Sequence, residues 1–343
     1  MGGLLMGVFL SVAAAAGLVF VPLPYAVMIP GPVTDTLGSL EGERIVDVSG
    51  TETYPTEGSL FFTTVRVRGG PDQRITVYDV LGAWLDPSSE VRPVEDFYPK
   101  GSTKEQVQDE GAAEMENSQQ VAAAVAARAL GQDVTVVVEV AGVQEGSAAA
   151  GLIEKGDEIV SVDGKPATSP AVVRAAVRAH PVGDAVPIVL RRAGAEVSVA
   201  PVAKDNAGTP VIGVLMTGKY TLPLDVTIHA GAVGGPSAGL MFSLAIYDLA
   251  TPGALTGGAK VAGTGTIADD GTVGPIGGIA QKMAGAKAGG ATWFLAPADN
   301  CTEVVGHIPD GLQVVRVDTF ATAEKAVTAI AADEAQDLPR CAP

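Results

Sequence analysis

The first 34 residues contain no Asp, Glu, Lys, Arg or His, and this uncharged start limits what the chain can fold into more than any other feature. Within it, residues 4–23 read LLMGVFLSVAAAAGLVFVPL, a run of 20 residues without an ionisable group. That length is enough to cross the hydrocarbon core of a membrane as a helix. We expect residues 1–30 to be a retained transmembrane anchor. A cleaved signal peptide is the alternative, because residues 13–17 (AAAAG) offer small side chains for a cleavage site.

An anchored chain of this kind is expected to sit in the cell membrane with a single pass, its folded domains outside the cytoplasm. The first basic residue is Arg44, so the flanks of the run carry no Lys or Arg that would set its orientation.

The composition of the whole chain suggests two or three globular domains and excludes one class of partner. The chain has 343 residues, of which 47% are hydrophobic and 5% aromatic, with much of the apolar content supplied by Ala and Gly. Its formal net charge is −17, and no stripe of Lys and Arg interrupts the acidic surface. Nucleic acid is therefore not an expected partner, because phosphate contacts need clustered basic side chains.

Residues 31–130 are predicted to form a small α/β accessory region with no chemistry of its own. Residues 30–42 are rich in Pro and Gly and are predicted to be a loop. Residues 58–69 alternate as a strand does, whereas residues 75–86 and 110–130 have helical spacing. Gly131 is predicted to stop the second helix.

Residues 131–203 carry a pattern of short strands around one helix near residues 170–179. The most specific part is residues 145–166, which read EGSAAAGLIEKGDEIVSVDGKP. This order of Gly-Ser, Gly-Leu, Gly-Asp and Val-Asp-Gly resembles a PDZ domain. The resemblance implies capture of an extended peptide along a sheet edge, with the terminal carboxylate held by backbone groups. A PDZ fold that serves only as a spacer is the alternative. Residues 204–208 (KDNAG) are predicted to be a linker.

Ser237 lies in Gly235-Pro236-Ser237-Ala238-Gly239, a Gly-x-Ser-x-Gly pattern that opens an apolar run of helical character. The pattern allows a nucleophile elbow of an α/β-hydrolase, for which Asp299 and His307 follow in the required order. That fold needs several βα units before its serine, and the chain leaves room for two strands at most. Of the three histidines, His180 belongs to the PDZ-like segment, and His229 and His307 are each better explained as structural or surface residues than as a base.

A lysine is the stronger candidate for the proton acceptor. Gly277-Gly278 and Gly289-Gly290 bracket a predicted helix in which Lys282 shares an apolar stripe with Ile279, Met283 and Ala286. Burial of an amine lowers its pKa, and a neutral amine can act as a general base for a hydroxyl. Lys287 lies about 140° further around the helix and is expected to face water. The alternative is that Lys282 reaches solvent along its alkyl stem.

Residues 222–240, 262–290 and 294–297 together resemble the proteolytic domain of Lon peptidases. With the anchor and the PDZ-like segment, the chain resembles the membrane-anchored, PDZ-containing Lon-like peptidases of bacteria, which lack an ATPase module. Consistent with this, the sequence has no Gly-x4-Gly-Lys-Ser/Thr. The resemblance implies Ser237 as nucleophile, Lys282 as base and Thr264 as a hydroxyl that holds the amine. Gly235, Pro236, Ala238 and Gly239 would shape the loop, and a ring of identical subunits would form. Many Lon enzymes have an acidic residue where this chain has Gly234.

Cys301 and Cys341 are the two cysteines of the chain. If the body is exported, a disulfide between them would pin residues 336–343, the predicted C-terminal tail. Two unrelated free thiols are the alternative. Their number and spacing do not resemble a metal site, and we expect neither a metal nor a cofactor.

These observations predict an α+β multidomain protein: a transmembrane helix, the accessory region, a PDZ domain (131–203) and a Lon-type proteolytic domain (209–335). The predicted function is an ATP-independent, membrane-anchored serine endopeptidase with a Ser237/Lys282 dyad, whose PDZ domain recruits or gates peptide substrates. The alternative is a non-catalytic PDZ adapter that keeps a Lon-like fold. An adapter would have no reason to keep both members of the dyad.

Overall fold

The computed structural model describes residues 6, 23–40, 42–70 and 73–342. The predicted anchor therefore lies outside the described residues, apart from Met6 and residues 23–30. Among the helices that are described, none combines the length and the apolar character needed to cross a membrane.

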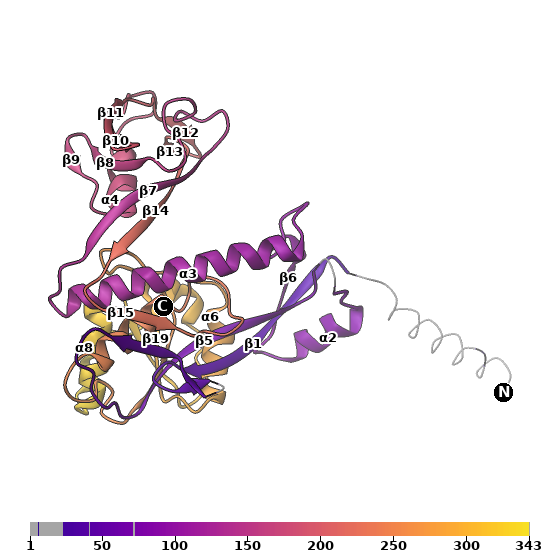
Figure 1. Ribbon diagram of the computed structural model, residues 1–343. Helices are drawn as coiled ribbons and strands as arrows, with labels where there is room; N and C mark the ends of the chain where they lie inside the picture. Colours follow the sequence, from indigo (N-terminus) through magenta and orange to yellow (C-terminus); the bar gives the residue numbers. More distant parts are fainter. Residues whose placement is uncertain (1–5, 7–22, 41, 71–72, 343) are drawn as a thin grey trace.

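The elements follow one another in three stretches of the chain (Figure 1). The first stretch holds β1 (Tyr25–Asp35), β2 (Ser39–Leu40), β3 (Glu43–Arg44), β4 (Val46–Ser49), β5 (Ser59–Arg68), α2 (Val77–Leu85), β6 (Glu90–Pro93), η1 (Val94–Asp96) and α3 (Lys104–Ala129). The second holds β7 (Thr135–Val143), β8 (Glu158–Val162), β9 (Lys165–Pro166), α4 (Pro170–Arg178), β10 (Ile188–Arg192), β11 (Ala195–Val199), β12 (Lys204–Asn206), β13 (Thr209–Val211) and β14 (Val214–Thr221). The third holds β15 (Asp225–Ile228), α5 (Gly239–Leu249), β16 (Lys260–Gly263), β17 (Thr266–Ile267), β18 (Val273–Gly274), α6 (Ile279–Ala288), β19 (Trp293–Pro297), η2 (Ala298–Asn300), α7 (Cys301–Val304), β20 (Gln313–Val317), α8 (Phe320–Ala331) and η3 (Ala335–Asp337).

The main body is built on a mixed sheet with the strand order β20-β19-β16-β5-β1-β6. The first four strands run parallel, and β1 and β6 are antiparallel to their neighbours. Alternate residues of a strand face opposite sides of the sheet. Val261 and Leu295 accordingly lie in the core under α5 and α8. Ala262 and Phe294 lie on the other side, in the core under α6 and α7. The body is thus a helix–sheet–helix sandwich.

The predicted division between residues 31–130 and 209–335 does not separate two folding units. Strands β1, β5 and β6 come from the first stretch, yet they hydrogen-bond in one sheet with strands of the third. Helix α3 also packs against α5, and its Val121–Ala127 segment lies in the same hydrophobic core. The N-terminal region is therefore part of the scaffold of the main body. Local sequence patterns did not reveal this, because parallel pairing of β5 with β16 joins residues about 200 positions apart.

The second stretch forms a separate unit, which we call the insert (residues 135–221). Its sheet has the order β11-β10-β8-β7-β14, with β9 paired to β8, and its core contains Val138, Ile159, Val173 and Leu190. β7 and β14 form a two-stranded ribbon, which begins at the pair Thr135 and Thr221 and ends at the pair Val143 and Val214. This ribbon carries the insert away from the main body (Figure 1). The insert thus enters and leaves the main body through adjacent strands.

Three local predictions were wrong in detail. Residues 30–35 belong to strand β1, where a register shift between Pro30 and Val33 accommodates the prolines that suggested a loop. The predicted linker at 204–208 is a hairpin, because β12 pairs with β13. The helix expected from residue 110 begins at Lys104, after Thr103 and Gln106 form a capping box.

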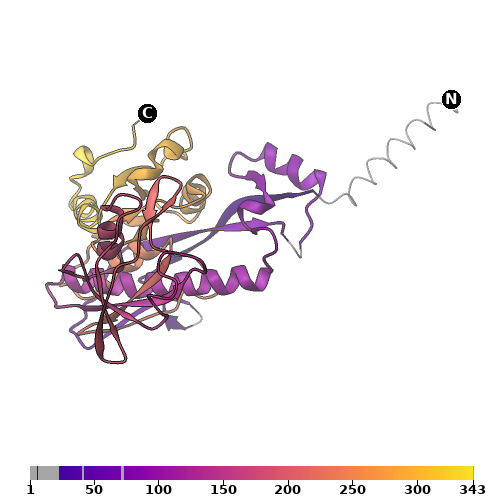
Figure 2. The same ribbon diagram turned by 90° about the horizontal axis from the view of Figure 1, so that it is seen from above.

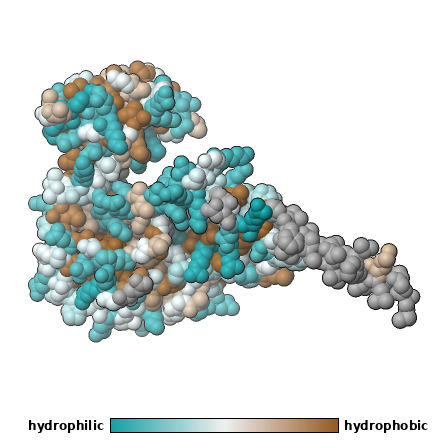
Figure 3. Space-filling model, turned by 45° about the vertical axis from the view of Figure 1, so that its right-hand side comes forward, coloured by the Kyte–Doolittle hydropathy of each residue, from teal (hydrophilic) through white to brown (hydrophobic). Residues whose placement is uncertain are grey.

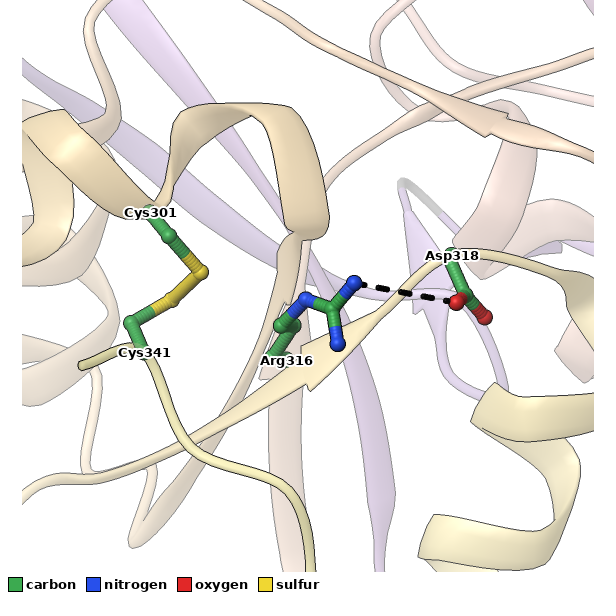
Figure 4. The surroundings of a disulfide bond; sticks show 4 residues. All are labelled: Cys301, Arg316, Asp318 and Cys341. Carbon is green, nitrogen blue, oxygen red and sulfur yellow. Dashed lines mark ion pairs between the residues drawn. A yellow bond between two sulfur atoms is a disulfide. The ribbon is translucent and has the colours of Figure 1, made fainter.

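Cys301 and Cys341 form a disulfide with their Cα atoms 5.0 Å apart. Cys301 begins α7, and Cys341 lies in the C-terminal tail, as Figure 4 shows together with the Arg316–Asp318 ion pair on the neighbouring strand. The tail is also held by a hydrogen bond from the Arg316 amide to the Pro339 carbonyl (2.8 Å). The disulfide therefore fastens the tail to the face of the sheet that carries α6.

Candidate active site

Ser237 lies in the tight turn before α5. Gly235 has φ +87°, which favours glycine, and a Cβ on Gly239 would lie 2.8 Å from Ile267 and Ser118 side-chain atoms. The glycines on either side of the serine are therefore required by backbone conformation and by close packing. Helix α5 begins at Gly239, two residues later than the sequence indicated, with Ala238 as its N-cap.

Helix α3 braces this turn from the other side. The Gly235 amide donates to the Gly111 carbonyl (2.8 Å), and Ser118 Oγ donates to the Pro236 carbonyl (3.1 Å). These two α3 residues were missed by the sequence analysis. Gly111 in a helix interior was a weak signal, since glycine is unfavourable there unless another backbone approaches closely.

Lys282 reaches the turn from α6, on the opposite side of the sheet. The N-cap of α6 is Gly278 at φ +71°, and a Cβ there would lie 2.8 Å from Val65 and 2.9 Å from Met28. Gly285 likewise lies close to the Gly31 carbonyl of β1. These small residues let α6 pack tightly on β1 and β5, which fixes the direction in which Lys282 points.

The Lys282 amine contacts two hydroxyl groups and is shielded from water. Its Nζ lies 2.8 Å from Ser237 Oγ and 3.0 Å from Thr264 Oγ1, and its residue is 2% exposed. Desolvation disfavours the charged ammonium and lowers the pKa of Lys282 to about 7. The Lys282 side chain is therefore buried, as expected for a base, and does not reach solvent along its alkyl stem. Lys287 instead donates to the Gly311 carbonyl at the surface (3.0 Å).

Thr264 follows the carboxyl end of β16 and joins the two sides of the site. Its hydroxyl donates to the Ser237 carbonyl (3.0 Å) and accepts a hydrogen bond from the Lys282 amine. The amide of the next residue, Gly265, donates a second hydrogen bond to the Ser237 carbonyl (2.8 Å). Thr264 thus fixes both the serine backbone and the amine.

The other candidate bases have different surroundings. His307 Nδ1 donates to the Glu303 carbonyl (2.9 Å), and His229 faces Glu43 at 3.8 Å. His180 pairs with Asp163 in the insert (2.8 Å). The structure therefore assembles the serine with the lysine and the threonine, and gives each histidine another partner.

Two hollows of about 550 and 580 Å³ adjoin the strand that leads to the serine turn. Both are lined by Gln119 of α3 and Ile228 of β15. Among the residues that the structure describes, β15 pairs with β4 along one edge and has no strand on the other. The groove formed by these hollows runs between β15 and α3. An extended chain placed there would lie beside β15 as an added strand.

A third, smaller hollow separates the insert from the main body. It is lined by Pro170 and Arg174 of α4, by residues 216–218 of β14, by Asn117 of α3 and by residues 267–269. Next to it, the Tyr220 hydroxyl donates to the Asp269 carboxylate, and Arg128 Nη1 donates to the Asp269 carbonyl (2.7 Å). The segment after β17 is therefore in contact with both the insert and the helix that braces the serine.

The main body and the insert each match a known protein family. Residues 212–329 match the Lon protease (S16) C-terminal proteolytic domain, and residues 139–192 match a PDZ domain. The chain is 37% identical over 102 residues to Lon protease of Clostridium beijerinckii (28% of this chain, 13% of that protein). It is 34% identical over 103 residues to Lon protease 2 of Bacillus subtilis (29% and 18%). The chain thus spans less than a fifth of the length of these two relatives.

Solved structures resemble the insert. The PDZ domain of an SdrC-like protein from Listeria monocytogenes is 27% identical, with 23% of this chain and 85% of that chain covered at a TM-score of 0.22. The PDZ domain of an SdrC-like protein from Listeria innocua is 30% identical (23% and 92%, TM-score 0.22). The two family matches by themselves show a mixed α+β multidomain protein that contains a PDZ domain and a Lon-type serine peptidase domain.

Proposed function

We propose that this protein is an ATP-independent serine endopeptidase, held at a membrane, in which Ser237 is the nucleophile and Lys282 the general base. The observation that carries the proposal is the Lys282 amine 2.8 Å from Ser237 Oγ, in a site where burial lowers the pKa of the amine to about 7, so that a substantial fraction of it is neutral near pH 7. Independence from ATP is proposed from the resemblance to Lon-like peptidases that lack an ATPase module.

The reaction follows from the geometry of the site. Lys282 Nζ takes the proton of Ser237 Oγ as Oγ bonds to the carbonyl carbon of the scissile peptide. The tetrahedral intermediate then expels the amine product, which takes the proton from Lys282 and leaves an acyl-enzyme. Lys282 Nζ then takes a proton from a water molecule, whose oxygen attacks the acyl-enzyme carbonyl. The acid product is released, and the proton returns from Lys282 to Ser237 Oγ.

The developing oxyanion needs hydrogen-bond donors, and the start of α5 supplies them. The first amides of a helix have no partner within the helix, and the helix dipole places partial positive charge there. Losing one such donor costs on the order of 10²–10³ in rate in serine peptidases. The groove along β15 is the proposed path of the substrate, with its backbone added to the free edge of that strand.

The PDZ domain is proposed to bind a peptide terminus and thereby to recruit substrate or gate the site. β14 is an edge strand of its sheet, and the hollow beside α4 is lined by residues of both units. A peptide bound there would touch residues 267–269, three positions beyond Thr264. Assembly into a ring of identical subunits and a location outside the cytoplasm remain proposals of the same kind, and rest on the resemblance and on the uncharged start.

The test uses the full-length protein in detergent or vesicles with an unfolded protein substrate. Ser237→Ala and Lys282→Met should each abolish cleavage, whereas Lys287→Ala, on the same helix, should cleave as wild type does. Cleavage that survives in Ser237→Ala would overturn the assigned nucleophile. A different result would favour the adapter. In that case the wild-type protein cleaves nothing but binds a tagged substrate, and altering the insert abolishes that binding.

A further inference from the structure

Helix α2 exposes a row of large apolar side chains. Leu81, Trp84 and Leu85 are 45%, 72% and 87% exposed. They are spaced i, i+3 and i+4, so they lie on one face, while Val80 and Ala83 are buried on another. Exposing a tryptophan and two leucines side by side costs solubility, and such a face usually marks a contact site.

The orientation of α2 is fixed without these residues. Val80 and Ala83 pack with Val27 and Ile75 in a small separate core. The N-terminus of the helix is held by a capping box, in which Asp79 accepts hydrogen bonds from the amide and the hydroxyl of Thr76 (both 2.7 Å). The helix is therefore seated by its buried face and its cap, and Trp84 and Leu85 of the exposed face remain mostly open to solvent.

The uncharged start of the sequence joins the body next to this helix. The Leu23 amide donates to the Ile75 carbonyl (3.1 Å), one residue before the N-cap of α2. Leu23 is the last residue of the apolar run 4–23. Helix α2 lies at the end of the body that is remote from the insert and from the C-terminus (Figures 1 and 2). Figure 3, with that end turned forward, shows hydrophobic surface there among hydrophilic patches.

From this placement we infer that α2 lies in the membrane interface, with Leu81, Trp84 and Leu85 inserted among the lipid acyl chains. The inference rests on the proposed anchoring at a membrane and adds a second contact to it. An amphipathic helix buries its apolar face about 5–10 Å into the boundary between headgroups and chains. Tryptophan is enriched at that depth, because its ring is apolar and its N–H is polar. The occupant of the face is thus a lipid bilayer.

The inference is tested with the full-length protein reconstituted in phosphatidylcholine vesicles whose acyl chains carry bromine, a contact quencher of tryptophan emission. The chain has two tryptophans, Trp84 and Trp293. Wild-type emission should be quenched relative to unbrominated vesicles, more by bromine near the headgroup end of the chain than near the methyl end. Trp84→Phe should remove that quenching. Leu215→Trp in the Trp84→Phe protein reports on the insert, where residue 215 is 68% exposed, and should stay unquenched.

The outcomes separate the two proposals. Protein that floats with the vesicles but shows no quenching of Trp84 would overturn the role of α2 and leave the anchoring intact. Protein that does not float would overturn both. An emission change that grows with the protein-to-lipid ratio, without quenching by bromine, would mean that the face pairs with a second copy of the chain, and would also overturn the inference.

Discussion

Lys282 is suited to its proposed role by what surrounds it. An exposed lysine is charged at neutral pH and has no lone pair to accept a proton. Here desolvation lowers the pKa of the amine to about 7, and the groups that face it most closely are hydroxyls. The fold therefore places beside the serine an amine of which a substantial fraction is neutral at neutral pH.

A pH dependence follows from this shift. The base is active when neutral, so kcat/KM for an uncharged peptide should be low below pH 6 and rise with an apparent pKa near 7 to a plateau. Stopped assays from pH 5 to 9, with thermal unfolding followed in parallel, would measure the profile. A rate that is flat across this range while the protein stays folded would contradict the lysine base.

The members of the candidate site differ in how far the sequence could predict them. Ser237 and Lys282 belong to short patterns with local meaning: a glycine-flanked turn, and a lysine in an apolar stripe. Thr264 was accessible only through the resemblance. Gly111 and Ser118 contact the serine turn from more than 100 positions away, and no local pattern connects the two segments.

At the scale of elements, the contact between α3 and the serine turn restricts which side chain position 234 can carry. A Cβ on Gly234 would lie 3.2 Å from the Gly111 carbonyl carbon and 3.4 Å from its oxygen, which is tighter than ordinary packing. A Cβ on Gly111 would lie 3.7 Å from the Gly234 Cα, at a normal contact distance. The two glycines face each other, yet only at Gly234 would an added Cβ be closer to its neighbour than an ordinary contact.

Because an added Cβ is crowded at Gly234 but not at Gly111, alanine substitutions at the two positions can be compared as a matched pair. Gly234→Ala should slow cleavage and lower the unfolding free energy by about 1–3 kcal/mol, the usual cost of overpacking. Gly111→Ala should keep activity, and α3, which is partly exposed at this position, gains up to about 1 kcal/mol from the better helix former. Equal activity loss in both variants, measured with the same peptide, would show that the close approach is not what restricts residue 234.

The disulfide gives a second prediction at this scale. It closes a loop with a sequence separation of 40, and Cys341 packs against the cluster that contains Ile279 and Met283 of α6. By loop entropy alone, its loss should destabilise the protein by about 4 kcal/mol. Thermal melts of wild type with and without reductant, and of the Cys301→Ser/Cys341→Ser double variant, would measure this. Reductant should leave the Tm of the double variant unchanged.

Elements with a strong local pattern were predicted well, and those set by distant contacts were not. The strand at 58–69 and the helices at 75–86 and 170–179 were confirmed as β5, α2 and α4. The start of β1 was missed because its prolines lie at a register shift that only pairing with β5 reveals. The hairpin β12–β13 was missed because its polar sequence resembles that of a linker.

For the whole molecule, the ribbon β7–β14 predicts that the PDZ domain can be removed cleanly. Val136 pairs with Tyr220, so residues 137–219 can be replaced by an Asn-Gly turn that keeps the base of the ribbon and the Tyr220–Asp269 hydrogen bond. This variant should fold and cleave a short unstructured peptide, while a substrate recognised through its terminus should lose most of its cleavage.

Comparing the two substrates in wild type and variant separates the roles of the units. Equal cleavage of both substrates by the variant would show that the PDZ domain neither recruits nor gates. Faster cleavage of the short peptide than in wild type would show that the domain restrains the site.

The ribbon also bears on how such a chain can change over generations. Because the insert leaves the body where it entered, a gene segment that encodes it can be lost, gained or exchanged without moving any strand of the main sheet. Selection can then replace the unit proposed to recognise a partner while the unit proposed to cleave stays unchanged. In a chain of this architecture, the proposed recognition of targets can therefore change independently of the proposed chemistry.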